Sequence, residues 1–191
     1  MIKNKFQDLK IILASQSPRR KELLSSLELI FESFTKSIDE SYPQKMEPTS
    51  VAKFLSEKKS NEYTIKDNEI IITADTIVIH KNNILNKPKD KMQAARMLRL
   101  ISGSSNNVMT GVCVRSNNKQ ISFAESTQVT FDALEESEIQ FYIEKYNPLD
   151  KAGAYGIQDW IGKIGVKNIN GCYYNVMGLP IHRLYQELKR F

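Results

Sequence analysis

Cysteine and histidine are scarce in this sequence. Among its 191 residues there are two cysteines and two histidines. Cys113 and Cys172 cannot form a disulfide framework, and both lie in apolar stretches where a small buried side chain is the simpler interpretation. Together with His80 and His182 they cannot assemble a zinc-ligand cluster of the usual spacing. The sequence therefore predicts a reduced protein without structural zinc.

Glycine, proline and long hydrophobic runs are also limited. Eight glycines and six prolines exclude collagen-like and linker-dominated architectures. The longest apolar runs, such as 70–72 and 77–79, are too short to span a bilayer, and residues 1–10 lack the apolar core of a signal peptide. Because domains usually contain about 100–200 residues, we expect one domain over 1–191, located in the cytoplasm and without membrane contact.

The net charge is +5, from 27 basic and 22 acidic residues. A positive balance favours anionic partners in general. No block of five basic residues occurs, and aromatic and basic residues do not alternate as they do on single-strand-binding surfaces. We therefore expect no nucleic-acid partner. The charge is compatible with a small molecule rich in phosphate.

The first half of the chain alternates between strand and helix patterns. Residues 10–14 and 69–80 are apolar and β-prone, as in strands buried on both faces. Ser17 and Pro18 predict the start of a helix with Leu23, Leu24 and Leu27 on its apolar face, and a second helix is expected over 49–61. A third helix begins after Asp90, with Gln93 completing a capping box and Gly103 beyond its end.

The second half predicts a hairpin and further helices. Alternating residues at 108–114 and 121–123 flank the turn 116–119, and 128–131 continues or adds a strand. A helix is expected over 139–146, and residues 172–174 are predicted as a strand. The last helix begins at Pro180. Together these patterns predict an α/β protein with a mixed sheet.

The loop Ser15–Arg20 is the first candidate site. A buried strand leads into the first turn of a helix, whose free N–H groups and positive dipole end favour an anion. Arg19 and Arg20 lie where a cation is disfavoured, which is understandable if phosphate binds there. An ordinary helix cap with two solvated arginines is the alternative. The glycines of a phosphate-binding loop are absent from the sequence, as are dinucleotide-binding and serine-hydrolase motifs.

Asp75 is the second candidate, because it interrupts an apolar strand. A buried carboxylate without partners costs several kcal/mol, so it needs a cation, a metal or donated hydrogen bonds. The alternative is an aspartate that reaches solvent or accepts structural hydrogen bonds. The loop acids Asp39 and Glu40 could hold Mg²⁺ together with Asp75, although a surface acid pair is more often solvated. Taken alone, Lys59 at a helix end and Lys87 before a helix have no assigned chemistry.

Several separate motifs occur in the order found in one known family. The chain resembles the Maf proteins, which are nucleoside triphosphate pyrophosphatases, over essentially its whole length. The resemblance is carried by Ala14–Leu24 (ASQSPRRKELL), Ala74–Thr76 (ADT), Lys87–Pro88, Ser102–Gly103, Asp150–Gln158 (DKAGAYGIQ) and Gly178–Pro180 (GLP). It implies a mixed, curved sheet flanked by helices, with two lobes around a central cleft, similar to inosine triphosphate pyrophosphatases.

The resemblance also implies an activity and a set of site residues. The family cleaves a nucleoside triphosphate between its α and β phosphates with a divalent cation, Mg²⁺ or Mn²⁺. Asp75 matches the catalytic acid that activates water, and Glu40 matches an acid that shares the metal with Asp75. The positions that match substrate-binding residues are Ser15, Arg19, Arg20, Lys59 and Lys87, and all of them except Arg19 match residues that surround the phosphates. The positions linked to the choice of nucleotide are Arg19, Thr76 and Gln158.

The Ala152–Gln158 block resembles the branch that acts on dTTP and UTP rather than on 7-methyl-GTP. A glutamine amide donates and accepts at once, so it suits the imide edge of these pyrimidines. The chain also departs from the family pattern. Thr73 and Asn86 stand where glycine is usual, Ser104 and Asn106 replace arginine and histidine, and Asn147 replaces an acid.

Three functional hypotheses follow. The first is a dTTP/UTP pyrophosphatase, and the second is a pyrophosphatase for modified or non-standard nucleotides. The third is a non-catalytic nucleotide-binding regulator of cell division. The intact Asp75 and the basic residues at the substrate-binding positions argue against it. The sequence leaves a homodimer open. The expected partner is a nucleoside triphosphate substrate.

Overall fold

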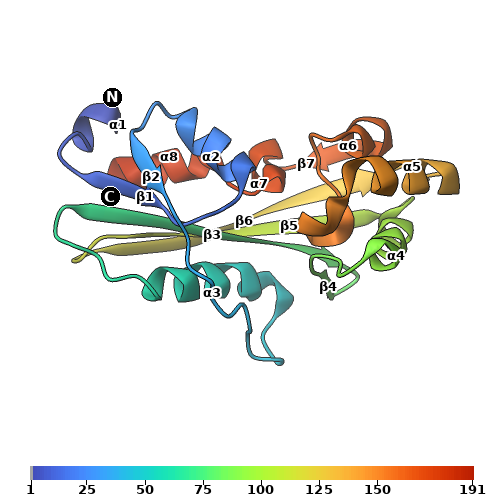
Figure 1. The fold of residues 1–191 in the computed structure, drawn as a ribbon, viewed down its shortest axis with the longest axis horizontal. Coiled ribbons are helices and arrows are strands. Elements are labelled where there is room, and N and C mark those ends of the chain that lie inside the picture. The colour runs from blue at the N-terminus through green and yellow to red at the C-terminus, as the bar shows by residue number, and fades with distance from the viewer. Residues whose placement is uncertain (1) are drawn as a thin grey trace. The chain divides into compact units, whose positions relative to one another are not determined.

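The computed structural model describes residues 2–191, apart from the side chain of Lys3. Strands and helices alternate along most of the chain (Figure 1). The strands are β1 (Lys10–Leu13), β2 (Phe31–Ser33), β3 (Glu69–His80), β4 (Asn83–Leu85), β5 (Ser105–Arg115), β6 (Gln120–Phe131) and β7 (Val166–Asn170). The α-helices are α1 (Ile2–Lys5), α2 (Pro18–Ser25), α3 (Pro48–Asn61), α4 (Lys91–Ile101), α5 (Glu136–Tyr146), α6 (Trp160–Gly165), α7 (Tyr173–Met177) and α8 (Ile181–Arg190). Two single turns of 3₁₀ helix, Pro148–Asp150 and Ala152–Ala154, follow α5.

The strands form one mixed sheet in the order β2-β1-β3-β5-β6-β7, with β4 paired to β3. Strand β1 runs parallel to both neighbours, with Ile11 opposite Phe31 of β2 and Ile70 of β3. Strands β4 and β7 run antiparallel to β3 and β6, respectively. The predicted α/β class and mixed sheet are confirmed, whereas the curvature and the cleft stay predictions.

The chain divides into two compact units, which are treated separately below. Unit 1 comprises 1–75, 110–125 and 178–191, and unit 2 comprises 76–109 and 126–177. The chain passes between the units four times, within β3, β5 and β6 and between Met177 and Gly178, and the first crossing falls between Asp75 and Thr76. The predicted single domain over 1–191 stays a prediction.

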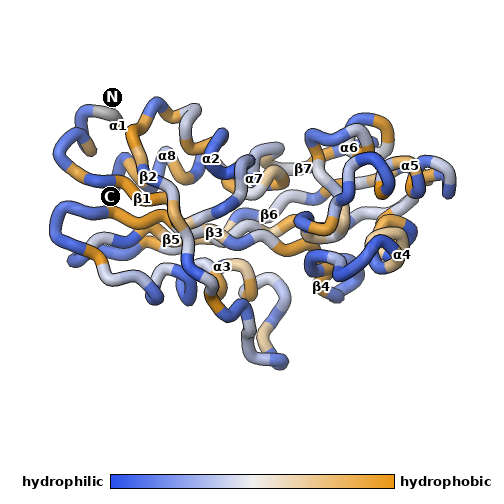
Figure 2. The backbone as a smooth tube through the Cα atoms, in the orientation of Figure 1, coloured by the Kyte–Doolittle hydropathy of each residue, from blue (hydrophilic) through white to orange (hydrophobic). Residues whose placement is uncertain are grey.

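Helices cover both faces of the strands in unit 1. Figure 1 shows α3 on one side of β1 and β3, and α2 and α8 on the other. Helix α3 lies very close to β5, because a Cβ atom at Gly111 would stand 2.2 Å from the Ala52 carbonyl oxygen. In Figure 2 hydrophobic residues gather along β1 and β3, while the connecting loops are mostly hydrophilic. The close packing fixes α3, which carries Lys59, against the sheet.

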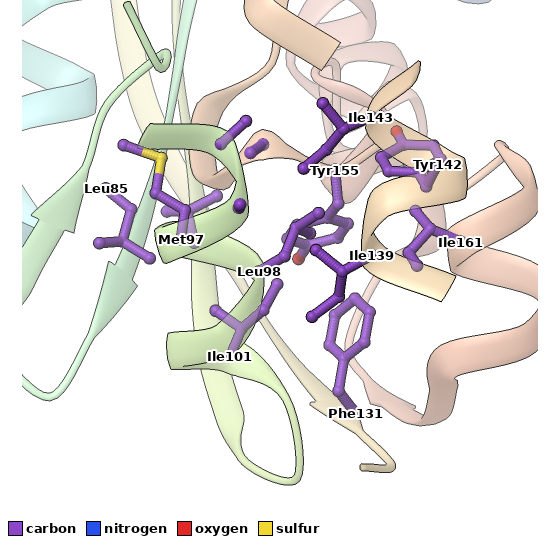
Figure 3. Packing of buried hydrophobic residues seen from close by; sticks show 14 of the residues in the cluster. Leu85, Met97, Leu98, Ile101, Phe131, Ile139, Tyr142, Ile143, Tyr155 and Ile161 are labelled. Atoms are coloured by element: carbon purple, nitrogen blue, oxygen red, sulfur yellow. The ribbon is translucent and has the colours of Figure 1, made fainter. Parts of the chain in front are cut away.

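Unit 2 has its own hydrophobic core between α4, α5 and the strands. Buried side chains from these elements pack together (Figure 3). Phe131 and Tyr155 meet edge to face, with ring centroids 4.9 Å apart. Tyr142 is fully buried in α5, and its ring stacks on that of Tyr146. This core supports the motif at 150–158 (DKAGAYGIQ), which contributes Ala154, Tyr155 and Ile157 to it. Among the described residues, no helix is long and apolar enough to cross a membrane.

Most predicted elements agree with the structure. Strand β3 has the predicted bounds, and 128–131 continues β6. Asp90 caps α4 by accepting from the Gln93 N–H, but the Gln93 side chain accepts from the Lys89 N–H, one residue before the expected capping box. Helix α2 ends at Ser25, so Leu27 lies beyond it.

The strand predicted at 172–174 is wrong, since α7 begins at Tyr173. The alternation of Cys172 and two tyrosines favoured a strand. In the structure both tyrosines are exposed, while Asn175 is fully buried and donates to the Val108 carbonyl and the Thr127 hydroxyl. Hydrogen bonding of the buried amide outweighs the β propensity of the aromatic residues.

Candidate active site

Asp75 lies at the point where β3 leaves unit 1. Only 7% of the residue is exposed, and the preceding residues 70–74 are buried as well. Its Oδ1 lies 2.5 Å from Nζ of Lys59. Among the described residues, no hydrogen bond uses its Oδ2. The sequence predicted that this carboxylate needs a cation, and in the structure that cation is Lys59.

Lys59 joins two acids in unit 1. It lies in the last turn of α3, and its Nζ is 2.7 Å from Glu40 Oε1 as well as 2.5 Å from Asp75 Oδ1. The side chains of Lys59 and Asp75 are 14% and 11% exposed, whereas that of Glu40 is 51% exposed. The ammonium group therefore sits between a buried and a half-exposed carboxylate. We call Glu40, Lys59 and Asp75 the acid–lysine cluster.

Two further residues hold α3 against the sheet, Thr73 from β3 and Arg115 from β5. The Thr73 hydroxyl donates to the Ser56 carbonyl oxygen at 2.6 Å. Arg115 clasps the C-terminal end of α3 by donating to the Ser60 hydroxyl at 3.0 Å, the Tyr63 carbonyl at 2.6 Å and the Ser60 carbonyl. The available sequence signal was a threonine, two residues before Asp75, standing where the family has glycine.

The loop before α2 is closed by its own hydrogen bonds. Ser17 caps α2 as predicted, accepting from the Arg20 N–H at 3.5 Å. Ser15 is buried, and its hydroxyl accepts from the Ser17 N–H at 3.2 Å. The Ser33 hydroxyl donates to the Ser15 carbonyl at 3.0 Å, tying the loop to β2. The serine at the predicted anion site is therefore held in place.

Arg20 is not a solvated arginine. Its Nε donates to the Gly178 carbonyl and its Nη1 to the Ala74 carbonyl, both at 2.8 Å. Burial lowers the pKa of Arg20, and the charges of Asp75 and Glu40 act in the opposite direction. The guanidinium therefore contacts the backbone next to Asp75 and lies in the field of the acid–lysine cluster. Arg19 is half-buried in the same helical turn.

Three predicted site residues belong to unit 2. Thr76 follows Asp75 directly and is half-buried. Lys87 is exposed in the segment between β4 and α4. Gln158 is half-buried, and its Oε1 is shielded from solvent without a hydrogen-bond partner among the described residues. A buried amide oxygen of this kind needs a hydrogen-bond donor that the described residues do not supply. That all the predicted site residues meet one nucleotide stays a prediction.

The carboxylates of Glu40 and Asp75 lie close enough to one positive charge to share a divalent cation. Within residues 2–191 no group of three or more His, Cys, Asp or Glu side chains could hold a metal. Two carboxylates without further protein ligands suit Mg²⁺, which usually combines one or two carboxylates with water and substrate phosphates.

Asp39 does not join this pair. Its carboxylate accepts from the Ser41 hydroxyl and from Lys58 Nζ, the latter at 2.9 Å. These hydrogen bonds lower the pKa of Asp39 to about 2. Of the two loop acids, only Glu40 contacts Lys59.

Comparison with known proteins agrees with the sequence motifs that resemble the Maf family. The family model described as Maf-like protein matches residues 10–191. Proteins named dTTP/UTP pyrophosphatase are similar over nearly the whole chain. That of Porphyromonas gingivalis is 49% identical over 95% of this chain and 94% of its own, and that of Phocaeicola vulgatus is 47% identical over the full length of both.

A solved structure of a HAM1 protein from Coxiella burnetii is 13% identical, covering 96% of this chain and 100% of its own, with a TM-score of 0.43. That structural likeness is too low to add to the assignment. The family model and the sequence relatives are sufficient: this chain belongs to the Maf family.

Proposed function

We propose that this protein hydrolyses dTTP and UTP to the nucleoside monophosphate and pyrophosphate. The support is of two kinds. Relatives that carry the name dTTP/UTP pyrophosphatase are 43–49% identical over at least 94% of this chain. The observation that carries the proposal is the acid–lysine cluster, in which a buried carboxylate is paired with a mostly buried ammonium group. Such an arrangement suits general-base chemistry beside an anionic substrate.

Asp75 acts as the proton acceptor in this proposal. Its Oδ2 makes no hydrogen bond among the described residues, so it would be available to hold the attacking water. As the water oxygen attacks the α-phosphorus, its proton passes to Asp75. The bond between the α-phosphorus and the bridging oxygen then breaks, and the electron pair leaves with pyrophosphate. Positioning and charge stabilisation supply most of the rate in reactions of this type.

Lys59 has two tasks in the reaction. In the structure its ammonium group keeps the buried Asp75 paired. With a triphosphate bound, the three N–H donors of the ammonium can also serve phosphate oxygens. Ser15, Arg19, Arg20 and Lys87 complete the substrate-binding set in the proposal. A divalent cation, held by Glu40 and Asp75, would neutralise phosphate charge and polarise the α-phosphorus.

Gln158 provides the base selectivity, together with Thr76 and Arg19. Thymine and uracil present an N3–H donor between two carbonyl oxygens. The Gln158 Oε1 can accept from that N–H while its Nε2 donates to a carbonyl. Cytosine presents an acceptor at N3 and a donor at N4, so with the amide in the same orientation Oε1 faces another acceptor and stays unpaired. A recognition group left unpaired in a site built for hydrogen bonding is strongly discriminated against.

The test is a nucleotide panel in ¹⁸O-labelled water, with Mg²⁺ or Mn²⁺. The proposal expects pyrophosphate release from dTTP and UTP above all other triphosphates, and ¹⁸O in the monophosphate only. Label in pyrophosphate would place the attack on the β-phosphorus and contradict the mechanism. Preferred turnover of modified nucleotides would favour the second hypothesis. Binding without turnover would favour the regulator of cell division.

We also propose that the enzyme works in the cytoplasm on free nucleotides, without a nucleic-acid partner.

A further inference from the structure

Gln158 stands at the third position of a tight turn in unit 2, and one tyrosine hydroxyl joins the two ends of that turn. The Asp159 N–H donates to the Gly156 carbonyl at 3.0 Å. The Gly156 N–H donates to the Tyr142 hydroxyl at 3.1 Å, and this hydroxyl donates to Asp159 Oδ2 at 2.8 Å. A single phenol therefore binds the first and last residues of the turn, with Gln158 between them.

Tyr142 itself is rigidly held. It is fully buried in α5, in the core that Figure 3 shows beside Ile139, Ile143 and Ile161. Its ring stacks on Tyr146 with centroids 5.1 Å apart. Burial raises the pKa of Tyr142, and the hydrogen bond to Asp159 raises it further. The hydroxyl therefore keeps its proton at neutral pH and donates it to the Asp159 carboxylate.

The turn is also closely packed. A Cβ atom at Gly156 would lie 2.5 Å from Asp159 Oδ2, so the carboxylate occupies the space that a side chain would need. Asp159 is the N-cap residue of α6, yet its side chain makes no capping hydrogen bond there. Its carboxylate instead contacts Tyr142 and lies 3.7 Å from Lys151 Nζ. The Asp159 carboxylate therefore stabilises the turn and does not cap α6.

We propose that Tyr142 and Asp159 are positioning residues for base recognition, holding the turn Gly156–Asp159 so that Gln158 presents its amide to uracil or thymine. The proposal rests on the proposed function of Gln158. Because the Gln158 Oε1 is shielded and has no partner among the described residues, its usefulness depends on where the backbone places it. A small displacement of such a group would weaken the hydrogen bond that it makes with the substrate in the proposed function.

The central experiment compares kcat and KM for UTP, dTTP and CTP in Tyr142→Phe. Phenylalanine keeps the ring packing and removes the hydroxyl, leaving the Gly156 N–H and the Asp159 carboxylate without this partner. We expect KM for UTP and dTTP to rise about tenfold with kcat within about twofold, and the preference for UTP over CTP to fall at least about fivefold. The proposal would be overturned if Tyr142→Phe kept the full preference for UTP over CTP while Gln158→Ala lost it.

Tyr155→Phe is the matched control. It also removes a buried hydroxyl in unit 2, which donates to Asn106 Oδ1 at 2.9 Å, but this hydroxyl joins neither end of the turn. We expect a lower Tm and an unchanged UTP:CTP preference. An equal loss of preference in both variants would contradict the proposal, because general loosening of unit 2 would then suffice.

A second pair of variants covers the case in which Tyr142→Phe does not fold. Asp159→Asn keeps an acceptor for the Tyr142 hydroxyl and should retain the UTP:CTP preference, whereas Asp159→Ala should lose it. Equal preference in the two would overturn the proposal.

Gln158→Ala separates this proposal from the proposed function. If Gln158→Ala leaves the preference unchanged, the role of Gln158 fails and the positioning role fails with it. If Gln158→Ala abolishes the preference while Tyr142→Phe and Asp159→Ala keep it, only the positioning role fails.

Discussion

Lys59 shows how one residue can connect a buried charge to a reaction. The sequence predicts that Asp75 needs a cation, because a carboxylate within an apolar strand is costly to bury. It does not predict which cation, since Lys59 is distant in the sequence and by itself only suits a helix end. The packing of α3 against β3 brings the two groups to 2.5 Å, and this contact exists only in the folded chain.

Lys59→Met tests the role of this ammonium group. We expect kcat for pyrophosphate release to fall about 100-fold, because a charge that stabilises the reacting phosphates is removed. Lys58→Met is the matched control, since Lys58 is the adjacent lysine and pairs with Asp39. Steady-state kinetics with UTP measures both. Equal losses in the two variants would show that general charge, rather than the Lys59–Asp75 contact, supports the activity.

Thr73 departs from the family pattern, and its hydroxyl makes a hydrogen bond that the usual glycine could not make. Its buried hydroxyl binds the Ser56 carbonyl, one turn of α3 before Lys59. Thr73→Val keeps the shape but loses the hydrogen bond, so we expect the free energy of unfolding to fall by about 1 kcal/mol, and kcat several-fold. Thr73→Ser should keep most of both. Urea unfolding and kinetics check this, and identical behaviour of the valine and serine variants would remove the hydroxyl from the account.

Helix α3 places Lys59 beside Asp75. Its position depends on the near contact between the Ala52 carbonyl and Gly111 of β5, and on the clasp of Arg115 at its C-terminal end. Strand β3 supplies the acid from its buried centre. The relative placement of a helix and a strand within unit 1 therefore sets the geometry of the acid–lysine cluster.

Gly111→Ala tests the close approach of α3. The added Cβ would stand 2.2 Å from the Ala52 carbonyl oxygen, so either α3 or β5 must move. We expect a loss of about 1–3 kcal/mol in the free energy of unfolding and a larger loss of kcat than any change in KM. Gly103→Ala is the control for kcat only: its Cβ would meet only one atom, at 4.0 Å, but its φ of +63° strains the backbone, so this variant also loses stability. Full activity in Gly111→Ala would contradict the role assigned to this contact.

Elements defined by strong local patterns could be predicted, and those defined by distant partners could not. The apolar run of β3 and the N-cap at Asp90 are local signals, and both agree with the structure. The helix α7 was predicted as a strand, because its conformation depends on Asn175 bonding to β5 and β6. Strand β7 has little apolar pattern of its own and exists through its pairing with β6.

At the scale of the whole molecule, the site residues are divided between the two units. The acid–lysine cluster and the loop before α2 belong to unit 1, while Thr76, Lys87 and Gln158 belong to unit 2. Local sequence reasoning found Asp75 and the Ser15–Arg20 loop. It could not find Lys87 or Gln158, which no local pattern marks as functional; the family motifs identified them. It also missed Tyr142 and Arg115, whose importance lies in hydrogen bonds across the fold.

Metal dependence follows from the two carboxylates of the cluster. Removal of divalent cations with EDTA should abolish pyrophosphate release, and Mg²⁺ should restore it. Glu40→Gln should raise the Mg²⁺ concentration for half-maximal activity about tenfold, as expected when a carboxylate ligand is lost. Glu57→Gln is the control, because Glu57 lies on α3 and pairs only loosely with Lys53, at 4.0 Å. Equal Mg²⁺ requirements in the two variants would exclude Glu40 from the metal site.

The most direct test of the central claim is kcat for dTTP hydrolysis by Asp75→Asn, measured beside the Kd for dTTP. Asparagine keeps the size of the side chain but cannot accept the proton of the attacking water. At Mg²⁺ concentrations that saturate each variant, we predict a loss of at least about 100-fold in kcat with the Kd within a few-fold, and near-normal kcat in the exposed control Asp39→Asn. A kcat within twofold of the unmodified protein would contradict the assignment of Asp75 as the base.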